Sequence, residues 1–92
     1  MKNPQSAALD SKALGDLCFA HLVEAPDELA RFMEYAGFDP ARLRRSLGTD
    51  DLALGLIDYF ANNEPLLLAL CANNDLKPEA FMRMWHRLNP GA

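Results

Sequence analysis

The sequence predicts an all-α fold, a compact single-domain bundle of five to six short helices built as two three-helix units with pseudo-two-fold symmetry. Apolar residues recur at helical intervals, which places them on one face of each helix. Proline and glycine interrupt this pattern where helices are expected to begin and end. In addition, the turn sequence Gly37–Pro40 has a counterpart in Asp75–Pro78, which indicates an internal repeat.

The repeat has a spacing of 38 residues, counted from Gly37 to Asp75, and extends through the apolar positions on both sides of the two turns. The matched pairs are Leu14 with Leu52, Phe19 with Ile57, Leu22 with Phe60, Leu29 with Leu67, Phe32 with Leu70, Leu43 with Phe81, and Leu47 with Trp85. Chance similarity of two amphipathic segments is the alternative, but the prolines in register favour a duplication. Each unit would then cover an apolar face that the other could not bury alone.

The first unit is expected to contain helices over residues 10–25, 26–36 and 40–47. Asp27 and Glu28 lie in the first turn of the second helix, where the helix dipole favours acidic side chains. Gly37 is expected to end that helix in the left-handed conformation. Asp39 followed by Pro40 signals the start of the third helix, because aspartate accepts hydrogen bonds from free amides and proline lacks an amide that would stay unpaired there.

The second unit is expected to contain helices over residues 49–61, 64–72 and 78–88. Thr49 is the expected N-cap of the first of these. The helix over residues 64–72 is apolar on all sides, which predicts burial all round and a central place for it and the helix before it. The last helix places Phe81, Met84 and Trp85 on its inward face.

A chain of 92 residues is expected to form one domain with one modest core. We expect residues 1–8 to be a flexible N-terminus, residues 9–89 to be the helical domain with units 10–48 and 49–88, and residues 90–92 to be a tail. The net charge of −4 disfavours a polyanionic partner, because affinity for nucleic acid depends largely on basic side chains that neutralise phosphates.

The compartment expected from the sequence is the cytoplasm. The longest apolar run, residues 65–72, is far shorter than the roughly 18 residues of a membrane-spanning helix, so we expect no membrane partner. The N-terminal residues lack the apolar stretch of a secretory signal. Cys18 and Cys71 lie in apolar helical stretches, which favours buried reduced thiols over a disulfide or a metal site.

Three sequence elements resemble a family of small helical proteobacterial proteins of unknown function. They are the turn Gly37–Pro40, the central segment Leu56-Ile57-Asp58 with Glu64 and Leu66-Leu67-Leu68, and the second turn Asp75–Pro78. The similarity covers about residues 12–88. Asp75 departs from the glycine that is usual there, and Pro65 in the fifth helix is a second departure. The resemblance implies a helical fold without an established activity, cofactor or catalytic residue, and it associates the protein with a signalling partner.

Candidates for catalysis or metal binding are few, and we expect neither an enzyme nor a cofactor or metal. His21 lies on an apolar helix face, where a single histidine is more often a core or boundary residue than a general base. Neither His21 nor His86 has ligating residues at metal-binding helical spacing. The sequence also contains no glycine-rich phosphate loop, no Gly-x-Ser-x-Gly elbow and no Cys-x-x-Cys motif.

Arg42, Arg44 and Arg45 form a basic cluster on the short third helix. This cluster allows an alternative function, a helix-turn-helix-like nucleic-acid-binding protein that uses the helix 40–47 for recognition. The acidic chain and the position of Asp39 beside the phosphates argue against it. A third alternative is a solvated face whose arginines pair with nearby carboxylates.

The preferred interpretation is a non-enzymatic protein-protein interaction or adaptor module, because a helical bundle without catalytic groups mainly offers surfaces. The predicted partner-binding residues are Tyr35, Arg42, Arg44, Arg45, Asp58, Met82, Arg83 and His86. Asp58 is either a surface residue, a partner of an arginine or a contact with another protein. Met82, Arg83 and His86 form a second surface, suited to a homodimer, although Tyr35 and Met82 could instead pack under neighbouring helices.

Overall fold

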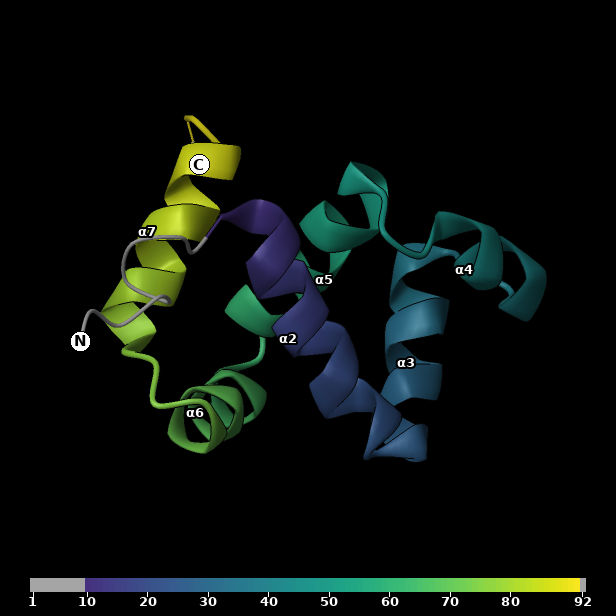
Figure 1. Cartoon of the computed structure of the whole chain (residues 1–92), viewed down its shortest axis with the longest axis horizontal. Helices are drawn as coiled ribbons and strands as arrows, with labels where there is room; N and C mark the ends of the chain where they lie inside the picture. The colour runs from purple at the N-terminus through teal and green to yellow at the C-terminus, as the bar shows by residue number, and fades with distance from the viewer. Residues whose placement is uncertain (1–9, 92) are drawn as a thin grey trace.

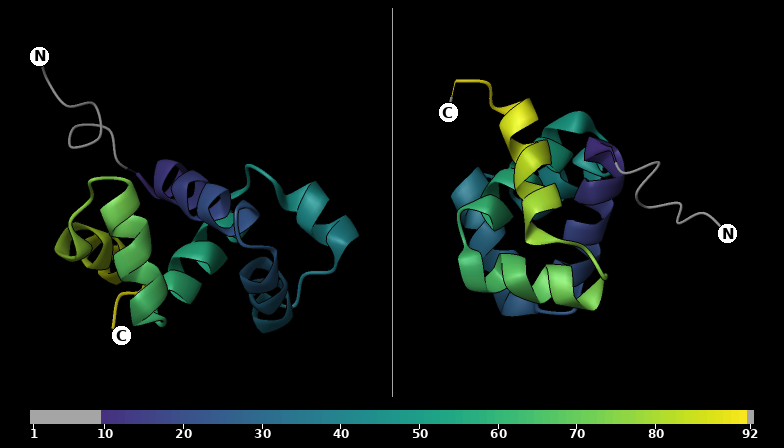
Figure 2. Two further views of the ribbon diagram at one scale, coloured as in Figure 1. Left: turned by 90° about the horizontal axis from the view of Figure 1, so that it is seen from below. Right: turned by 90° about the vertical axis from the view of Figure 1, so that its left-hand side faces the viewer.

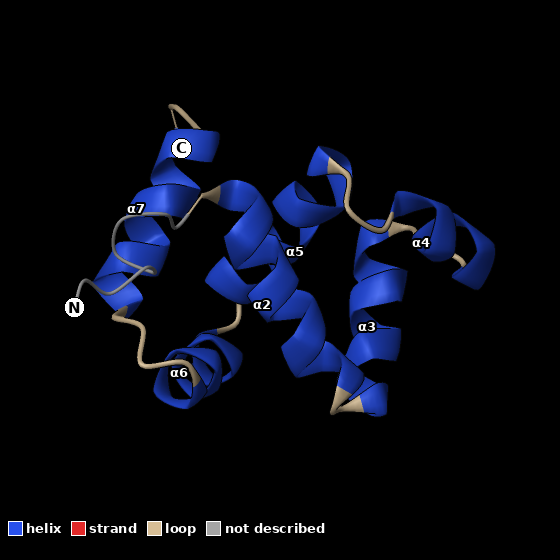
Figure 3. Ribbon diagram, viewed as in Figure 1, coloured by secondary structure: helices blue, strands red, loops and turns tan. Residues whose placement is uncertain are grey.

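Six α-helices follow one another in residues 10–91, the part of the chain that the computed structural model describes (Figure 1). They are α2 (Ser11–Val23), α3 (Pro26–Ala36), α4 (Pro40–Ser46), α5 (Asp50–Ala61), α6 (Glu64–Asn73) and α7 (Pro78–Leu88). Turns and loops connect them, and these residues contain no strand (Figure 3). The predicted all-α, single-domain class is confirmed, whereas the predicted flexible segment 1–8 lies outside the described residues.

The helix starts follow the capping signals of the sequence. The side chain of Asp10 accepts a hydrogen bond from the amide of Ala13 at 2.8 Å, and Asp39 accepts one from the amide of Arg42 at 2.7 Å. Thr49 caps α5 in the same way. Proline occupies the first turn of α3, α4, α6 and α7, where no intrahelical partner for its missing amide would exist.

Helix α5 is the centre of the bundle, because it contacts each of the other five helices in the described part of the chain. Helix α2 crosses it, with α3 and α4 on one side and α6 and α7 on the other (Figure 1). The fully buried large side chains come from all of these helices except α4, and they are Leu14, Cys18, Leu22, Phe32, Leu56, Ile57, Phe60, Leu70 and Phe81. No helix of residues 10–91 is long and apolar enough to cross a membrane.

The crossing of α2 and α5 is unusually close at Gly15. A Cβ atom added to this glycine would lie 2.7 Å from the Cβ and 2.9 Å from the Cα of Ala53, distances too short for any side chain. Glycine weakens a helix interior by about 1 kcal/mol relative to alanine, so its presence here is explained by the space that α5 occupies. Gly15 and Ala53 are 38 positions apart and are therefore counterparts in the repeat. Contact between counterparts is what a two-fold axis produces.

The two turns that carry the repeat also have the same hydrogen bond. The amide of Phe38 donates to the carbonyl of Met33 at 2.8 Å, and the amide of Leu76 donates to the carbonyl of Cys71 at 2.9 Å. Both bonds span five residues, as in a Schellman helix end. The two donor residues are 38 positions apart, and so are the two acceptor residues. The duplication itself stays a prediction that these contacts support.

The left-handed residue in the two turns differs. Gly37 has a φ angle of 77°, whereas its counterpart Asp75 has a φ angle of 52° and is the single non-glycine residue with positive φ in the described chain. Aspartate is among the few residues that tolerate this region, because its short polar side chain can bond locally. The departure from glycine at Asp75 therefore leaves the shape of the turn intact.

The prediction that α6 is buried all round is wrong. Leu67, Leu70 and Cys71 are buried, but Leu68 is 47% exposed and Ala69 and Ala72 are exposed as well. The reason is that α6 lies at the edge of the bundle. It packs on α2, α5 and α7 with one face, and its other face is not covered. Of the two helices predicted to be central, α5 has that place and α6 does not.

We expect Gly15→Ala to lower the free energy of unfolding by about 1–3 kcal/mol, since the added methyl group must push α2 away from α5. Urea denaturation of the purified variants would measure this. Gly55→Ala is the matched control, because a Cβ there would meet only the ring of Phe32 at an ordinary 3.8 Å. Alanine at Gly55 should leave stability unchanged or raise it by up to about 1 kcal/mol. Equal losses in the two variants would contradict the close crossing.

Candidate interaction surface

The predicted partner-binding residues lie on four helices, and the structure brings only some of them together. Tyr35 of α3 and Asp58 of α5 are in direct contact. The arginines of α4 form a separate exposed group, and the residues predicted on α7 form a third. The predicted partner-binding residues therefore form three separate surfaces.

Asp58 holds three helices together. Its carboxylate accepts a hydrogen bond from the hydroxyl of Tyr35 at 2.7 Å and another from the indole Nε1 of Trp85 at 3.0 Å. The side-chain amide of Asn62 donates to it as well, at 3.3 Å. Because Tyr35 belongs to α3 and Trp85 to α7, this one carboxylate links both helices to α5. Asp58 thus has a structural role.

The arginine partner considered for Asp58 is not what the structure contains, because its donors are two aromatic side chains and the amide of Asn62. The sequence contained a signal for the contact with Trp85 that was missed. A buried or half-buried indole N–H usually finds an acceptor, and Trp85 was expected on the inward face of its helix. Tyr35 is 55% exposed, so its ring lies at the surface while its hydroxyl is bound. The hydrogen bond to Asp58, together with burial, raises the pKa of Tyr35 above its usual value.

A second tyrosine–carboxylate contact lies beside the first. The hydroxyl of Tyr59 donates to the carboxylate of Glu28, which also accepts from the guanidinium of Arg31 at 3.1 Å. The hydrogen bonds from Tyr59 and then Arg31 lower the pKa of Glu28, while burial and the bond to Glu28 raise the pKa of Tyr59 to about 12. The rings of Tyr59 and Tyr35 are 5.1 Å apart, so the two contacts together fasten α3 to α5.

The arginines of α4 differ in how far they are engaged. The guanidinium of Arg42 donates to the carbonyl of Gly37 at 3.2 Å and lies 4.7 Å above the ring of Phe38, so it supports the turn between α3 and α4. Arg44 and Arg45 are exposed. The ion pairs in residues 10–91 are Lys12 with Asp16 and Arg31 with Glu28, and neither includes α4. Pairing with nearby carboxylates is therefore not how the structure uses this cluster.

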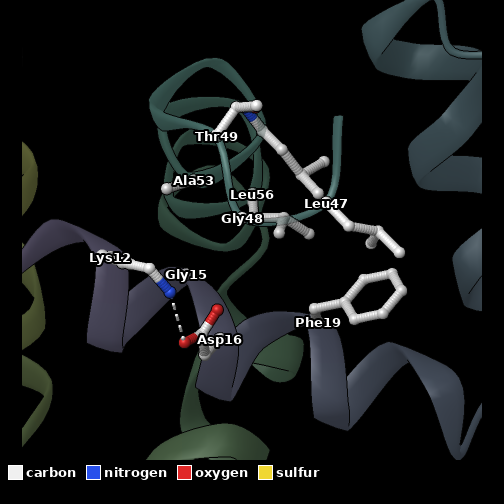
Figure 4. A pocket seen from close by; sticks show the side chains of 10 residues that line it. Lys12, Gly15, Asp16, Phe19, Leu47, Gly48, Thr49, Ala53 and Leu56 are labelled. Carbon is white, nitrogen blue, oxygen red and sulfur yellow. Dashed lines mark hydrogen bonds and ion pairs between the residues drawn. The ribbon is translucent and has the colours of Figure 1, made fainter. Parts of the chain in front are cut away.

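An apolar hollow begins where this basic helix ends. Leu47 is the C-cap of α4 and is 48% exposed, and it lines the hollow together with residues of α2 and α5. Figure 4 shows the half-buried ring of Phe19 facing Leu47, with the ion pair of Lys12 and Asp16 at the far rim. The remaining lining residues are Gly15, Gly48, Thr49, Leu52, Ala53 and Leu56. Basic and apolar groups thus adjoin on one surface.

The residues predicted on α7 are divided between the interior and the surface. Met82 packs against the core, so the alternative in which it lies under neighbouring helices applies. Arg83 is exposed. His86 is exposed with its ring against Trp85, at 5.0 Å between the centroids. This leaves a small polar surface without an exposed apolar centre.

Other groups of chemical interest are inside the fold. Cys18 and Cys71 are free, buried thiols, as predicted, and burial raises the pKa of both. The half-buried ring of His21 lies edge-on to Phe60 at 5.8 Å. Within residues 10–91 no group of three or more His, Cys, Asp or Glu side chains is placed to hold a metal ion. The expected absence of enzymatic activity and of a cofactor stays a prediction.

Comparison with models of known protein families gave a match. A family model described as a protein of unknown function, DUF3572, matches residues 8–91. The chain belongs to the DUF3572 family. The predicted resemblance to a family of unknown function is thereby confirmed, while the proteobacterial source stays a prediction. Comparisons with curated proteins and with solved structures gave no match. A functional proposal for this DUF3572 protein therefore depends on its own surfaces.

In this DUF3572 protein we expect Asp58→Ala to lower the free energy of unfolding by about 1–3 kcal/mol, because the donors of Tyr35 and Trp85 lose their acceptor. Chemical denaturation would measure the loss. Asp16→Ala removes a carboxylate from an exposed pair on α2 and should change stability by less than about 0.5 kcal/mol. A loss at Asp58 no larger than at Asp16 would contradict the linking role.

We also expect Tyr59 and Glu28 to shape the pH dependence of stability. The folded state holds the proton of Tyr59 until about pH 12, whereas the unfolded chain releases it near the ordinary value of 10.0, so stability falls as pH rises between these values. Glu28 contributes stability above its ordinary pKa of 4.5 that is lost as pH falls below it.

Tyr59→Phe should therefore flatten both the alkaline and the acid decline, and urea denaturation across the pH range would show it. Tyr35→Phe is the comparison variant on the acid side, because it leaves the contact of Tyr59 with Glu28 in place. On the alkaline side Tyr35 contributes as well, since its own pKa is raised, so both variants should flatten that decline. Identical pH profiles for wild type and Tyr59→Phe would rule out the assigned roles.

Proposed function

We propose that this protein is a non-enzymatic protein-interaction module whose binding surface is the α4 face, defined as Arg44, Arg45, Leu47 and Phe19. The observation that carries the proposal is that two exposed arginines lie close in sequence to an exposed leucine at the rim of an apolar hollow. Neither arginine takes part in the ion pairs of the described chain. Arginine beside an apolar pocket is a frequent centre of binding energy in protein interfaces.

The chemistry of the α4 face indicates an acidic partner segment that carries at least one apolar side chain. The guanidinium groups of Arg44 and Arg45 can each bind a carboxylate through two hydrogen bonds. The exposed Leu47 and the shallow hollow of about 30 Å³ beside it would contact the apolar side chain and remove part of it from water. The chain as a whole has a net charge of −4, so an acidic partner would be attracted to basic groups such as those of α4 and not to the chain in general.

Several features support a protein rather than a nucleic acid as the partner. Helix α4 has seven residues, and the carboxylate of Asp39 lies at its N-terminal end, where a recognition helix would approach the phosphates. Arg42 is engaged with Gly37 and Phe38, which leaves two arginines for a polyanion that usually needs more. A helix-turn-helix role is therefore the less supported alternative.

Location and the absence of catalysis belong to the same proposal. Two free, buried thiols suit a reducing compartment such as the cytoplasm. The pKa values that are shifted belong to buried thiols and to tyrosine, glutamate and arginine groups that contact one another within the fold. Shifted values of that origin serve structure, so we assign no reaction to them. A signalling partner stays a prediction.

Selection of peptides from a displayed random library on the purified protein would test the function. We expect enrichment of peptides that combine Asp or Glu with a large apolar residue, and binding by these peptides should weaken at least about tenfold in Arg44→Glu/Arg45→Glu, which corresponds to about 1.4 kcal/mol. The matched control is Arg83→Glu/Arg87→Glu, which changes the net charge equally on exposed positions of α7.

Peptides that lose affinity equally in both double variants, or no enriched peptides at all, would contradict the α4 face. A complex with single-stranded or duplex DNA that dissociates steeply with salt and is lost only in the α4 variant would instead favour the nucleic-acid function.

A further inference from the structure

Helix α4 is attached to the core differently from the other helices. None of its residues is buried, whereas every other helix of residues 10–91 contributes at least one buried side chain. Leu43 is half-buried and packs against the core, and the other residues of α4 are exposed apart from the half-buried Ser46. The left-hand view of Figure 2 shows α4 at the end of the molecule away from α6 and α7. One apolar side chain therefore provides most of the attachment of α4 to the core.

The hydrogen bonds of α4 add little to this attachment. The guanidinium of Arg42 donates to the carbonyl of Gly37, and the hydroxyl of Thr49 donates to the carbonyl of Ser46 at 2.6 Å. Both bonds lie within the turns at the two ends of α4. Among the described residues, no hydrogen bond or ion pair joins α4 to the body of another helix. Helix α3, by contrast, is fastened to α5 by two tyrosine–carboxylate contacts.

The residues that flank α4 are well anchored. Phe38 is 8% exposed, and its ring stacks on that of Phe32 at 5.9 Å between the centroids. Leu52, in the first turn of α5, is 3% exposed. Gly48 lies between α4 and α5 with a φ angle of 81°, and glycine reaches other backbone conformations readily, so the chain can pivot there. Residues 39–48 can therefore leave the core while the chain on both sides stays in place.

We propose that α4 opens as a separate unit while the other helices stay folded, and that Leu43 is the side chain that holds it closed. A region with few buried apolar contacts and solvent-exposed backbone hydrogen bonds opens at a lower free energy than the core. A helix of seven residues has little stability of its own, so α4 loses its helical hydrogen bonds when Leu43 leaves the core. The α4 face exists only in the closed state.

The charges of α4 connect this opening with binding. Arg42 and Arg45 are three residues apart, so they are neighbours on the helix surface and their like charges weaken the helix. The helix dipole offsets part of this repulsion, because Arg44 and Arg45 lie in the last turn. An acidic segment bound to Arg44 and Arg45 would neutralise more of it and favour the closed state. This ordering by a partner rests on the proposed function, whereas the opening itself does not.

Amide hydrogen exchange of the purified protein, followed by NMR, tests the opening. The amide of Leu43 donates to the carbonyl of Asp39 at 2.8 Å. After correction for intrinsic rates, we expect it and the other bonded amides of α4 to exchange at least about a hundredfold faster than those at the centre of α5. Leu43→Ala should raise the rates in α4 at least about fivefold. Leu43→Met keeps most of the apolar volume and should restore most of the protection.

Leu66→Ala is the matched control, because Leu66 is a half-buried leucine of α6 that packs on the core on the opposite side of α2 and α5 from α4 (Figure 1). This variant destabilises the core that stays folded when α4 opens, so it should speed exchange at the centre of α5 and leave the rates in α4 unchanged. Circular dichroism checks that each variant is folded.

Equal protection of α4 and α5 in wild type would overturn the proposal, and so would rates in α4 that rise with those of α5 in Leu66→Ala, because α4 would then open only together with the core. Unchanged rates in α4 for Leu43→Ala would refute the role of Leu43. An acidic peptide enriched on the α4 face should slow exchange in α4. A failure of the peptide alone would count against the proposed function, since the other measurements need no partner.

Discussion

The close contact of α2 and α5 at Gly15 and Ala53 is the constraint on which the remaining structure depends. Because Gly15 has no side chain, the two helices approach so closely that no methyl group would fit between them. Their apolar faces form the centre of the core. Every other helix packs on this pair, with one half of the bundle on each side. Gly15 and Ala53 also line the hollow between α2 and α5, so the close approach of these two helices limits how deep the hollow can be.

The helix positions could be predicted from the sequence because their signals are local. Proline in a first turn and a capping aspartate or threonine act within a few residues, so their effect does not depend on the rest of the fold. Burial is different. Nothing in the apolar sequence of α6 shows whether a helix covers Leu68, and the carboxylate of Asp58 gives no indication that its donors come from α3 and α7. Such properties are decided by packing between segments far apart in the chain.

The polar contacts of α3 explain why the α4 face has room for a partner. Tyr35 and Glu28 fasten α3 to Asp58 and Tyr59 of α5, so the first unit is held by its second helix. Helix α4 has no fully buried side chain and is held by the half-buried Leu43. A short helix anchored at one apolar position can keep its basic side in solvent while the core remains closed.

One matched pair of residues, Leu47 and Trp85, differs in burial between the two units, and this difference connects the fold with the proposed function. Trp85 in the second unit is half-buried and bonded to Asp58, whereas its counterpart Leu47 in the first unit is 48% exposed beside the hollow. Under the predicted duplication, the second unit holds this position by a hydrogen bond inside the fold, whereas the first unit leaves it at the surface. The exposed apolar side chain that results is the one the proposed α4 face offers to a partner, and the arginines of α4 beside it would select an acidic segment.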